Sequence, residues 1–314
     1  MGITQKNHYV PQLYLKNFSD TNRFIHRFRF LVSAAKTRPW EKRHISDVAF
    51  HHNLYTSCGT GEDDDDLERW LGSEFEITAG AVLARAITDQ QLTPADFRTL
   101  AKFVELQILR TPAHYFRKEE SWYESVQKTL KESHDDLLSR AAKTGSVPQA
   151  KLDATFEART VVSARMRKLL PIRVTREDDE ELGIARFRTD AVTGRPMWRY
   201  EMQRMLKNPE VTLVNHRWTI LHAPIGIEWP TSDDPVMCLN YQSANEYNFG
   251  GGWGSDGTEI MLPISPTHLL YTQINKKVPP RGTILLYDQA LKIKHLIVEH
   301  AHRDIYSLEP DDAV

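Results

Sequence analysis

The opening stretch, KNHYVPQLYLKNFSD, places His8 among aromatic and aliphatic side chains. An imidazole serves as a general base or as a metal ligand near neutral pH. Chain ends are mobile unless they are tied down, but this one has enough apolar surface to dock on a core and hold His8 in place. A histidine held in this way serves either chemistry or the fold. The apolar residues of the stretch are Tyr9, Val10, Leu13, Tyr14, Leu15 and Phe18.

A second motif, PTSDDPV at residues 230–236, carries hydroxyls and two carboxylates after a strand-like segment. Because Pro235 restricts Asp234 to extended geometry, the turn would aim Ser232 and Asp233 rigidly. Loops held by a rigid scaffold often carry binding and catalytic residues. The alternative is an Asx or Ser turn, in which these side chains only satisfy backbone donors.

A third motif, ELQILRTP, ends a helix expected at 93–111 and contributes Gln107 and Arg110. Gln107 projects about 80° from the centre of the helix's apolar stripe, and Arg110 lies at the margin of that stripe. An arginine at such a boundary either binds an anion or covers the core with its aliphatic stem. Near the end of the helix, its charge is also favoured by the helix dipole.

Two other histidine groups are less suited to holding a metal ion. His295, Glu299 and His302 would share one face of an expected C-terminal helix. That face lies opposite the apolar stripe, which indicates a solvated surface. His51 and His52 are adjacent, and adjacent residues of a strand point to opposite faces.

The elements that must position these residues change in character along the chain. Residues 1–60 mix aromatic residues with short extended runs such as NRFIHRFRFL. Apolar residues spaced by three and four predict a helical part over about 66–185, with Thr93 as an N-cap and further helices at 118–143 and 149–169. From about 210 to 290, segments such as EIMLPIS and THLLYTQI indicate strands.

A closing helix is expected in YDQALKIKHLIVEHAHRDIYS. Helices followed by strands are typical of an α+β fold. We therefore expect an N-terminal mixed segment, a central helical region and a mainly antiparallel C-terminal sheet, all within a single domain over residues 1–314.

Composition limits the classes of function. The chain has 314 residues and a net charge of -2, which argues against a protein that coats nucleic acid by bulk attraction. Its two cysteines form no disulfide framework, which is typical of a reducing compartment. No window approaches about 18 uninterrupted apolar residues, and the first residues lack the apolar core of a signal peptide. We expect a cytoplasmic protein that does not bind membranes.

Taken in order, these motifs resemble a family of bacterial proteins known as a domain of unknown function. The resemblance runs over nearly the whole chain and implies no particular activity. It draws attention to His8, Tyr9, Gln107, Arg110, Ser232 and Asp233, because these residues fall inside its motifs. The motifs are HYVPQLYLKNF, NLYT, a helix with Glu68 and Glu74, LQILRTP, WPTSDDPV, LPISP and AHRDIYS.

With the resemblance, we expect His8, Glu74, Arg110 and Asp233 to meet in one site. Imidazole and carboxylates would hold Mg²⁺ or Mn²⁺, and Arg110 would bind a phosphate. Gln107, Tyr9 and Ser232 would contact the substrate. This set predicts metal-assisted hydrolysis of a phosphodiester, in nucleic acid or in a phosphate-containing small molecule, by a nuclease-like enzyme such as a bacterial defence or toxin effector.

The alternative is a non-catalytic binding or regulatory module. In that hypothesis the same polar residues are structural, and the protein recognises a partner or a small anionic ligand.

Overall fold

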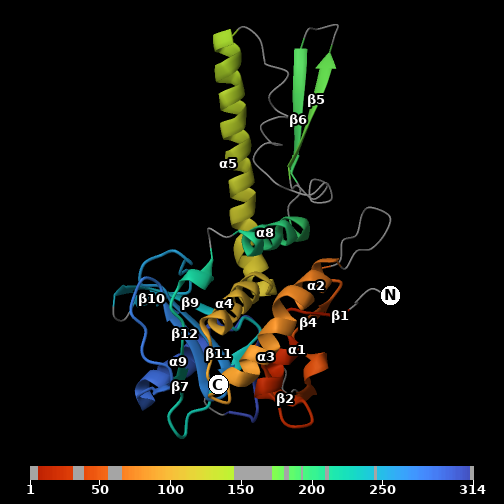
Figure 1. The fold of residues 1–314 in the computed structure, drawn as a ribbon. Helices are drawn as coiled ribbons and strands as arrows, with labels where there is room; N and C mark the ends of the chain where they lie inside the picture. The colour runs from red at the N-terminus through yellow and green to blue at the C-terminus, as the bar shows by residue number, and fades with distance from the viewer. Residues whose placement is uncertain are drawn as a thin grey trace. The chain divides into compact units, whose positions relative to one another are not determined.

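The computed structural model describes residues 6–30, 39–55, 66–144, 172–179, 184–191, 194–208, 212–243 and 246–311. The chain divides into two compact units, Met1–His114 with Met205–Val314, and Tyr115–Arg204. Helices predominate in the middle of the described chain and antiparallel strands after it (Figure 1), which confirms the α+β class.

The helices of the first unit come mainly before its large sheet. Helices α2 and α3 join through a π-helical turn, Gly72–Glu76. At the next helix, α4, the Thr93 hydroxyl accepts from the Asp96 amide while the Asp96 carboxylate accepts from the Thr93 amide, so the expected N-cap is confirmed. Helix α4 ends at Leu109, and Pro112 begins the following helix. The helices are α1 Gln12–Leu15, α2 Asp66–Leu71, α3 Ile77–Ala86, α4 Pro94–Leu109 and α9 Tyr287–His300.

The main sheet of the first unit has six strands in the order β10-β9-β11-β12-β7-β13. All pairs of adjacent strands in this sheet are antiparallel except the pair β13 and β7, which is parallel. This arrangement confirms the expected C-terminal sheet. Its strands are β7 Thr219–His222, β9 Met237–Ser243, β10 Glu246–Asn248, β11 Glu259–Ser265, β12 His268–Gln273 and β13 Thr283–Ile284.

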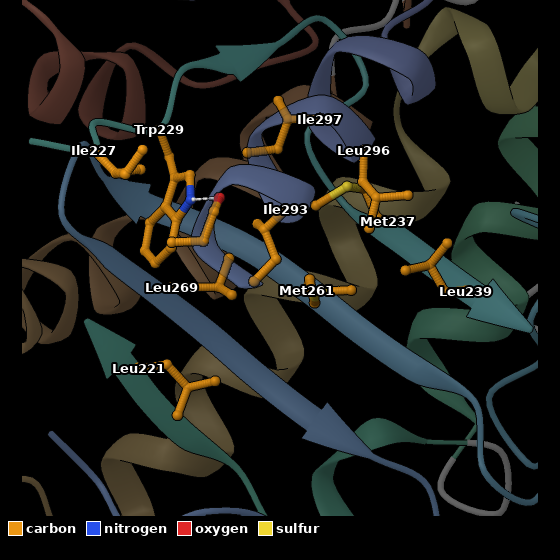
Figure 2. Packing of buried hydrophobic residues seen from close by; sticks show 11 residues of the cluster. Leu221, Ile227, Trp229, Met237, Leu239, Met261, Leu269, Ile293, Leu296 and Ile297 are labelled. Carbon is orange, nitrogen blue, oxygen red and sulfur yellow. Dashed lines mark hydrogen bonds between the residues drawn. The ribbon is translucent and has the colours of Figure 1, made fainter. Parts of the chain in front are cut away.

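Helix α9 covers one face of this sheet. Figure 2 shows Ile293 and Leu296 of α9 above this face of the sheet, and both belong to one buried apolar cluster with Leu221 and Leu269. The indole of Trp229 donates to the carbonyl of Ala290 at 2.9 Å, which fixes the start of the helix. The expected closing helix is therefore confirmed.

The closing helix is shorter than the segment YDQALKIKHLIVEHAHRDIYS in which it was expected. It ends at His300, and β14, Asp304–Ser307, follows as a strand of a second, four-stranded sheet in the order β3-β2-β14-β8. His302 therefore lies beyond the helix, and the expected spacing with His295 does not apply. The remaining strands are β1 Lys6–His8, β2 Phe24–Arg29, β3 Trp40–His44, β4 Phe50–His52 and β8 Thr231–Ser232.

The second unit contains most of α5, Pro112–Thr144, and most of α8, Arg195–Lys207. Strands β5, Ile172–Asp179, and β6, Ile184–Ala191, form an antiparallel pair where the sequence predicted helix to about residue 185. Apolar and polar residues alternate in RVTRED and ARFRTD, which favours strands. The helix expected at 149–169 lies outside the described residues. Among the described residues, no helix combines the length and apolar character needed to cross a membrane.

The opening segment docks on the first unit as expected. Tyr9, Val10, Tyr14, Leu15 and Phe18 are buried. The Tyr14 hydroxyl lies 2.7 Å from Thr231 Oγ1 and donates to the carbonyl of Pro263 at 2.5 Å. The opening segment is thus joined to the four-stranded sheet through Thr231 and to the six-stranded sheet through Pro263.

Replacing Tyr14 by Phe should lower the free energy of unfolding by about 1–3 kcal/mol, because the buried carbonyl of Pro263 loses its donor. Denaturant unfolding measures the change. The matched control is Tyr287→Phe, since Tyr287 is exposed and its hydroxyl is solvated. Equal stability of both variants would contradict a structural role for the Tyr14 hydroxyl.

Candidate functional site

Arg110 lies in the core of the first unit, with no solvent exposure. Its guanidinium donates to Glu76 Oε1 at 2.5 Å and to the backbone carbonyl of His8. The Tyr55 hydroxyl donates to the Arg110 carbonyl at 2.7 Å. Desolvation lowers the pKa of Arg110, but the facing Glu76 carboxylate outweighs it and the net pKa is raised. This charge is paired and buried, so it is poorly placed to bind a phosphate from solvent.

Glu76, and not Glu74, is the carboxylate that faces Arg110. Glu74 is exposed, whereas Glu76 is partly buried and ion-paired with Arg110. The two residues are separated by only one position on the π-helical turn, and residues two apart on a helix do not share a face. The segment expected near Arg110 does contact it, through Glu76 and not through Glu74.

His8 contacts Arg110 through its backbone and not through its ring. The imidazole is partly buried against the ring of Phe50, 5.7 Å away between centroids. Burial lowers its pKa, with a smaller contribution from the nearby Arg110 charge. Within the described chain, no hydrogen bond or ion pair joins the His8 side chain to Asp233.

Asp233 uses both carboxylate oxygens to accept backbone amides. They accept from His302 at 2.9 Å and from Arg303 at 3.0 Å, and the Asp233 amide donates to the Asp304 carbonyl at 3.0 Å. Burial, helped by the carboxylates of Asp304 and Asp234, raises the pKa of Asp233 to about 7 against these two amide donors. The side chain holds β14 against β8, as the alternative interpretation of this turn expected.

The rest of the PTSDDPV turn is also engaged internally. The Ser232 hydroxyl accepts from the Asp234 amide at 3.2 Å. Thr111 Oγ1 donates to Asp234 Oδ1 at 3.0 Å, and His300 Nε2 lies 3.2 Å from Asp234 Oδ2. The turn therefore joins the α4–α5 connection to the end of α9.

Tyr9 and Gln107 complete the predicted set. Tyr9 is buried, and burial together with the charges of Asp233 and Asp304 raises its pKa. Gln107 is fully buried, and its amide makes no hydrogen bond within the described residues. The structure thus brings Tyr9 near Asp233, joins His8 to Arg110, and leaves Glu74 on the surface.

A different group of three residues has donor atoms close enough together that they could hold a metal ion. One donor atom each from Asp89, His222 and His268 lie within 4.8 Å of one another. His222 Nε2 is 3.1 Å from Asp89 Oδ1, and His268 Nε2 is 3.5 Å from Asp89 Oδ2. The two imidazole centroids are 4.5 Å apart. Three side chains from distant segments therefore direct nitrogen and oxygen donors to one point.

Strand register places the two histidines. His268 pairs directly with His222 across β12 and β7, so both side chains point to the same face of the sheet. Their neighbours Leu269 and Leu221 face α9, so the histidines point away from that helix. Asp89 follows α3 in the left-handed backbone region, with φ 55°, which Asp adopts more readily than most residues.

Hydroxyl groups orient the more buried histidine. Ser265 Oγ and Thr267 Oγ1 lie 2.9 and 3.0 Å from His268 Nδ1. When Nδ1 carries the proton and donates to a hydroxyl oxygen, the lone pair of Nε2 points toward Asp89. The side chain of Asp89 is 54% exposed and that of His222 is 20% exposed, so the cluster opens to solvent.

None of these three residues is among those predicted from the sequence. His222 and His268 stand at the ends of TILH and HLLYTQ, where a single histidine has no motif spacing. The only available signal was that both histidines occupy strand ends. Their meeting depends on which strands pair, and that is not encoded in the local pattern.

The chain belongs to the family described as a protein of unknown function, DUF4238, whose model matches residues 6–311. No curated protein and no solved structure matches the chain.

Glu76→Gln should destabilise the protein by about 3–5 kcal/mol, because it leaves the buried charge of Arg110 without its carboxylate. Glu74→Gln is the matched control, two positions earlier in the chain and exposed, and should change stability by less than about 0.5 kcal/mol. Thermal and denaturant unfolding measure both. The Arg110 account fails if the two variants unfold alike.

Asp233 should also make stability depend on pH. Burial raises the pKa of Asp233 in the folded protein to about 7. The contribution of the protonated Asp233 side chain to stability is therefore fully present below the unfolded pKa and is lost as pH rises through 7. The difference in melting temperature between wild type and Asp233→Asn should therefore shrink between pH 5 and pH 8. A difference that stays constant over this range would show an ordinary carboxyl pKa.

Proposed function

We propose that the protein is a metal-dependent hydrolase whose metal ion is held by Asp89, His222 and His268. The observation that carries the proposal is the convergence of their three donor atoms within 4.8 Å. Ligands about 2.1 Å from a tetrahedral ion lie about 3.4 Å from one another. The separations of 3.1 Å from His222 Nε2 to Asp89 Oδ1 and of 3.5 Å from His268 Nε2 to Asp89 Oδ2 are close to this spacing, with each imidazole facing a different oxygen of the carboxylate.

The donor set favours a divalent transition ion. Two imidazoles suit Zn²⁺, Fe²⁺ or Ni²⁺, whereas Mg²⁺ prefers oxygen ligands and bound water. Of the ions expected from the sequence, Mn²⁺ fits these donors better than Mg²⁺. Zn²⁺ is the most direct probe, because catalytic zinc sites use this combination of two histidines and a carboxylate.

Three protein ligands suit a catalytic site better than a closed structural one, because they leave a coordination position for water. Bound water would have its pKa lowered to about 7 and would supply hydroxide at neutral pH. The hydroxide oxygen would form a bond to the electrophilic atom of the substrate while the bond to the leaving oxygen breaks. The leaving oxygen would take up one proton, which balances the proton released when the water ionises.

Arg110 and Asp233, which were predicted from the sequence to belong to the catalytic site, contribute to the fold instead. Arg110 and Asp233 are saturated by internal partners, which favours a structural role for them. We therefore assign catalysis to the metal cluster and folding to the polar network. A cytoplasmic location is part of the proposal and is supported by the low number of cysteines.

The second candidate function is a binding module that uses the same metal without catalysis. The observation in its favour is that Asp233 and Asp234 both bind other residues of the protein. Asp233 accepts two backbone amides, and Asp234 faces His300, so neither carboxylate is left to act as a general base.

Metal binding can be tested on the full chain after chelator treatment. Calorimetric titration with Zn²⁺ should give one site, and His222→Asn, His268→Asn or Asp89→Asn should each weaken it. Loss of a partner that only orients a ligand costs about 10–100-fold in metal affinity, so loss of a ligand should cost at least as much. His295→Asn is the control, because His295 is exposed on α9.

Absence of zinc binding to wild type, or unchanged binding in all three ligand variants, would overturn the metal site. Hydrolysis is then measured on zinc-loaded protein with p-nitrophenyl acetate and bis(p-nitrophenyl) phosphate. Turnover that disappears in His268→Asn supports the hydrolase. Tight zinc binding without turnover of either compound would contradict it and favour the binding module.

A further inference from the structure

Arg281 lies beside the cluster of Asp89, His222 and His268. Its guanidinium donates to the backbone carbonyl of Gln90 at 2.8 Å, and Gln90 directly follows Asp89. Burial and the neighbouring His222 lower the pKa of His268, and the Arg281 charge contributes to the same shift. The guanidinium is therefore within electrostatic reach of the imidazoles.

The backbone of Arg281 is tied to the strand that carries His222. The amide of Gly282 donates to the carbonyl of Ile220 at 2.9 Å, and Ile284 pairs with His222 in register. Gly282 has φ 81°, a left-handed conformation that glycine adopts without strain. Arg281 is thus held at its backbone by β7 and at its side-chain end by the loop that bears Asp89.

Arg281 differs from two paired arginines of the first unit in its charge partners. Among the described residues no carboxylate forms an ion pair with it, whereas Arg85 pairs with Asp96 and Arg110 with Glu76. Arg281 is partly exposed, and one of its five N–H donors meets Gln90. A fixed cation with spare donors beside the proposed metal ion is suited to an anionic ligand.

We propose that Arg281 binds an oxygen of a phosphate group coordinated at the metal cluster, so that the substrates are small phosphate esters. This inference rests on the proposed metal site. A guanidinium fork matches the geometry of phosphate oxygens, and charge-assisted hydrogen bonds of this kind are strong. The same contact stabilises the charge that develops during attack on phosphorus. The net charge of -2 favours a small ester over a polyanion.

The test uses full-length, zinc-loaded protein freed of excess metal and inorganic phosphate as the probe. In calorimetric titrations, Arg281→Gln should bind phosphate at least about tenfold more weakly than wild type, because a charge-assisted contact is lost. Arg281→Lys should fall between them, because it keeps the charge but not the fork. Arg98→Gln, an exposed arginine on α4, is the control and should bind as wild type does.

The outcomes separate this inference from the metal site. Arg281→Gln should still bind one zinc ion, because Asp89, His222 and His268 are unchanged. Unchanged phosphate affinity in Arg281→Gln and Arg281→Lys, with zinc bound, overturns the role of Arg281 and leaves the metal site standing. Acetate bound as tightly as phosphate, or an oligonucleotide bound more tightly, overturns the substrate class. Failure of wild type to bind zinc overturns the proposed function itself.

Discussion

The first unit depends on the pairing of one charge that has no contact with water. Burying a guanidinium costs free energy unless its N–H groups are hydrogen-bonded and its charge is paired. Arg110 meets these demands with the Glu76 carboxylate, the carbonyl of His8 and the hydroxyl of Tyr55. These partners come from the opening segment, the π-helical turn and the segment after β4. The need to pair one charge therefore fixes several distant parts of the chain.

The proposed metal centre depends on a second constraint, the register of β7 and β12. His222 and His268 face the same side of the sheet because they are direct partners across the two strands. A slip of one residue would turn one imidazole to the opposite face, toward α9. The apolar contacts of Leu221 and Leu269 with α9 resist such a slip. The core that stabilises the sheet thus also brings the candidate ligands together.

The sequence predicts elements more completely than it predicts which side chains meet. The cap formed by Thr93, the strands after residue 210 and the buried opening segment follow from local patterns of polarity. Glu74 was expected from its place in the family motif, and on the π-helical turn it is Glu76 that faces Arg110. His222 and His268 could not be paired in advance, because register between distant strands is set by tertiary packing. Local chemistry identified residues that hold the fold and missed those that converge at the sheet.

The most direct measurement of the central claim is anomalous diffraction at the zinc absorption edge from crystals of the zinc-loaded protein. The account predicts one strong peak about 2.0–2.2 Å from Asp89, His222 and His268, with at least one water completing the coordination. A zinc peak at His8 and Asp233, or no peak between the three side chains in fully loaded crystals, would contradict it.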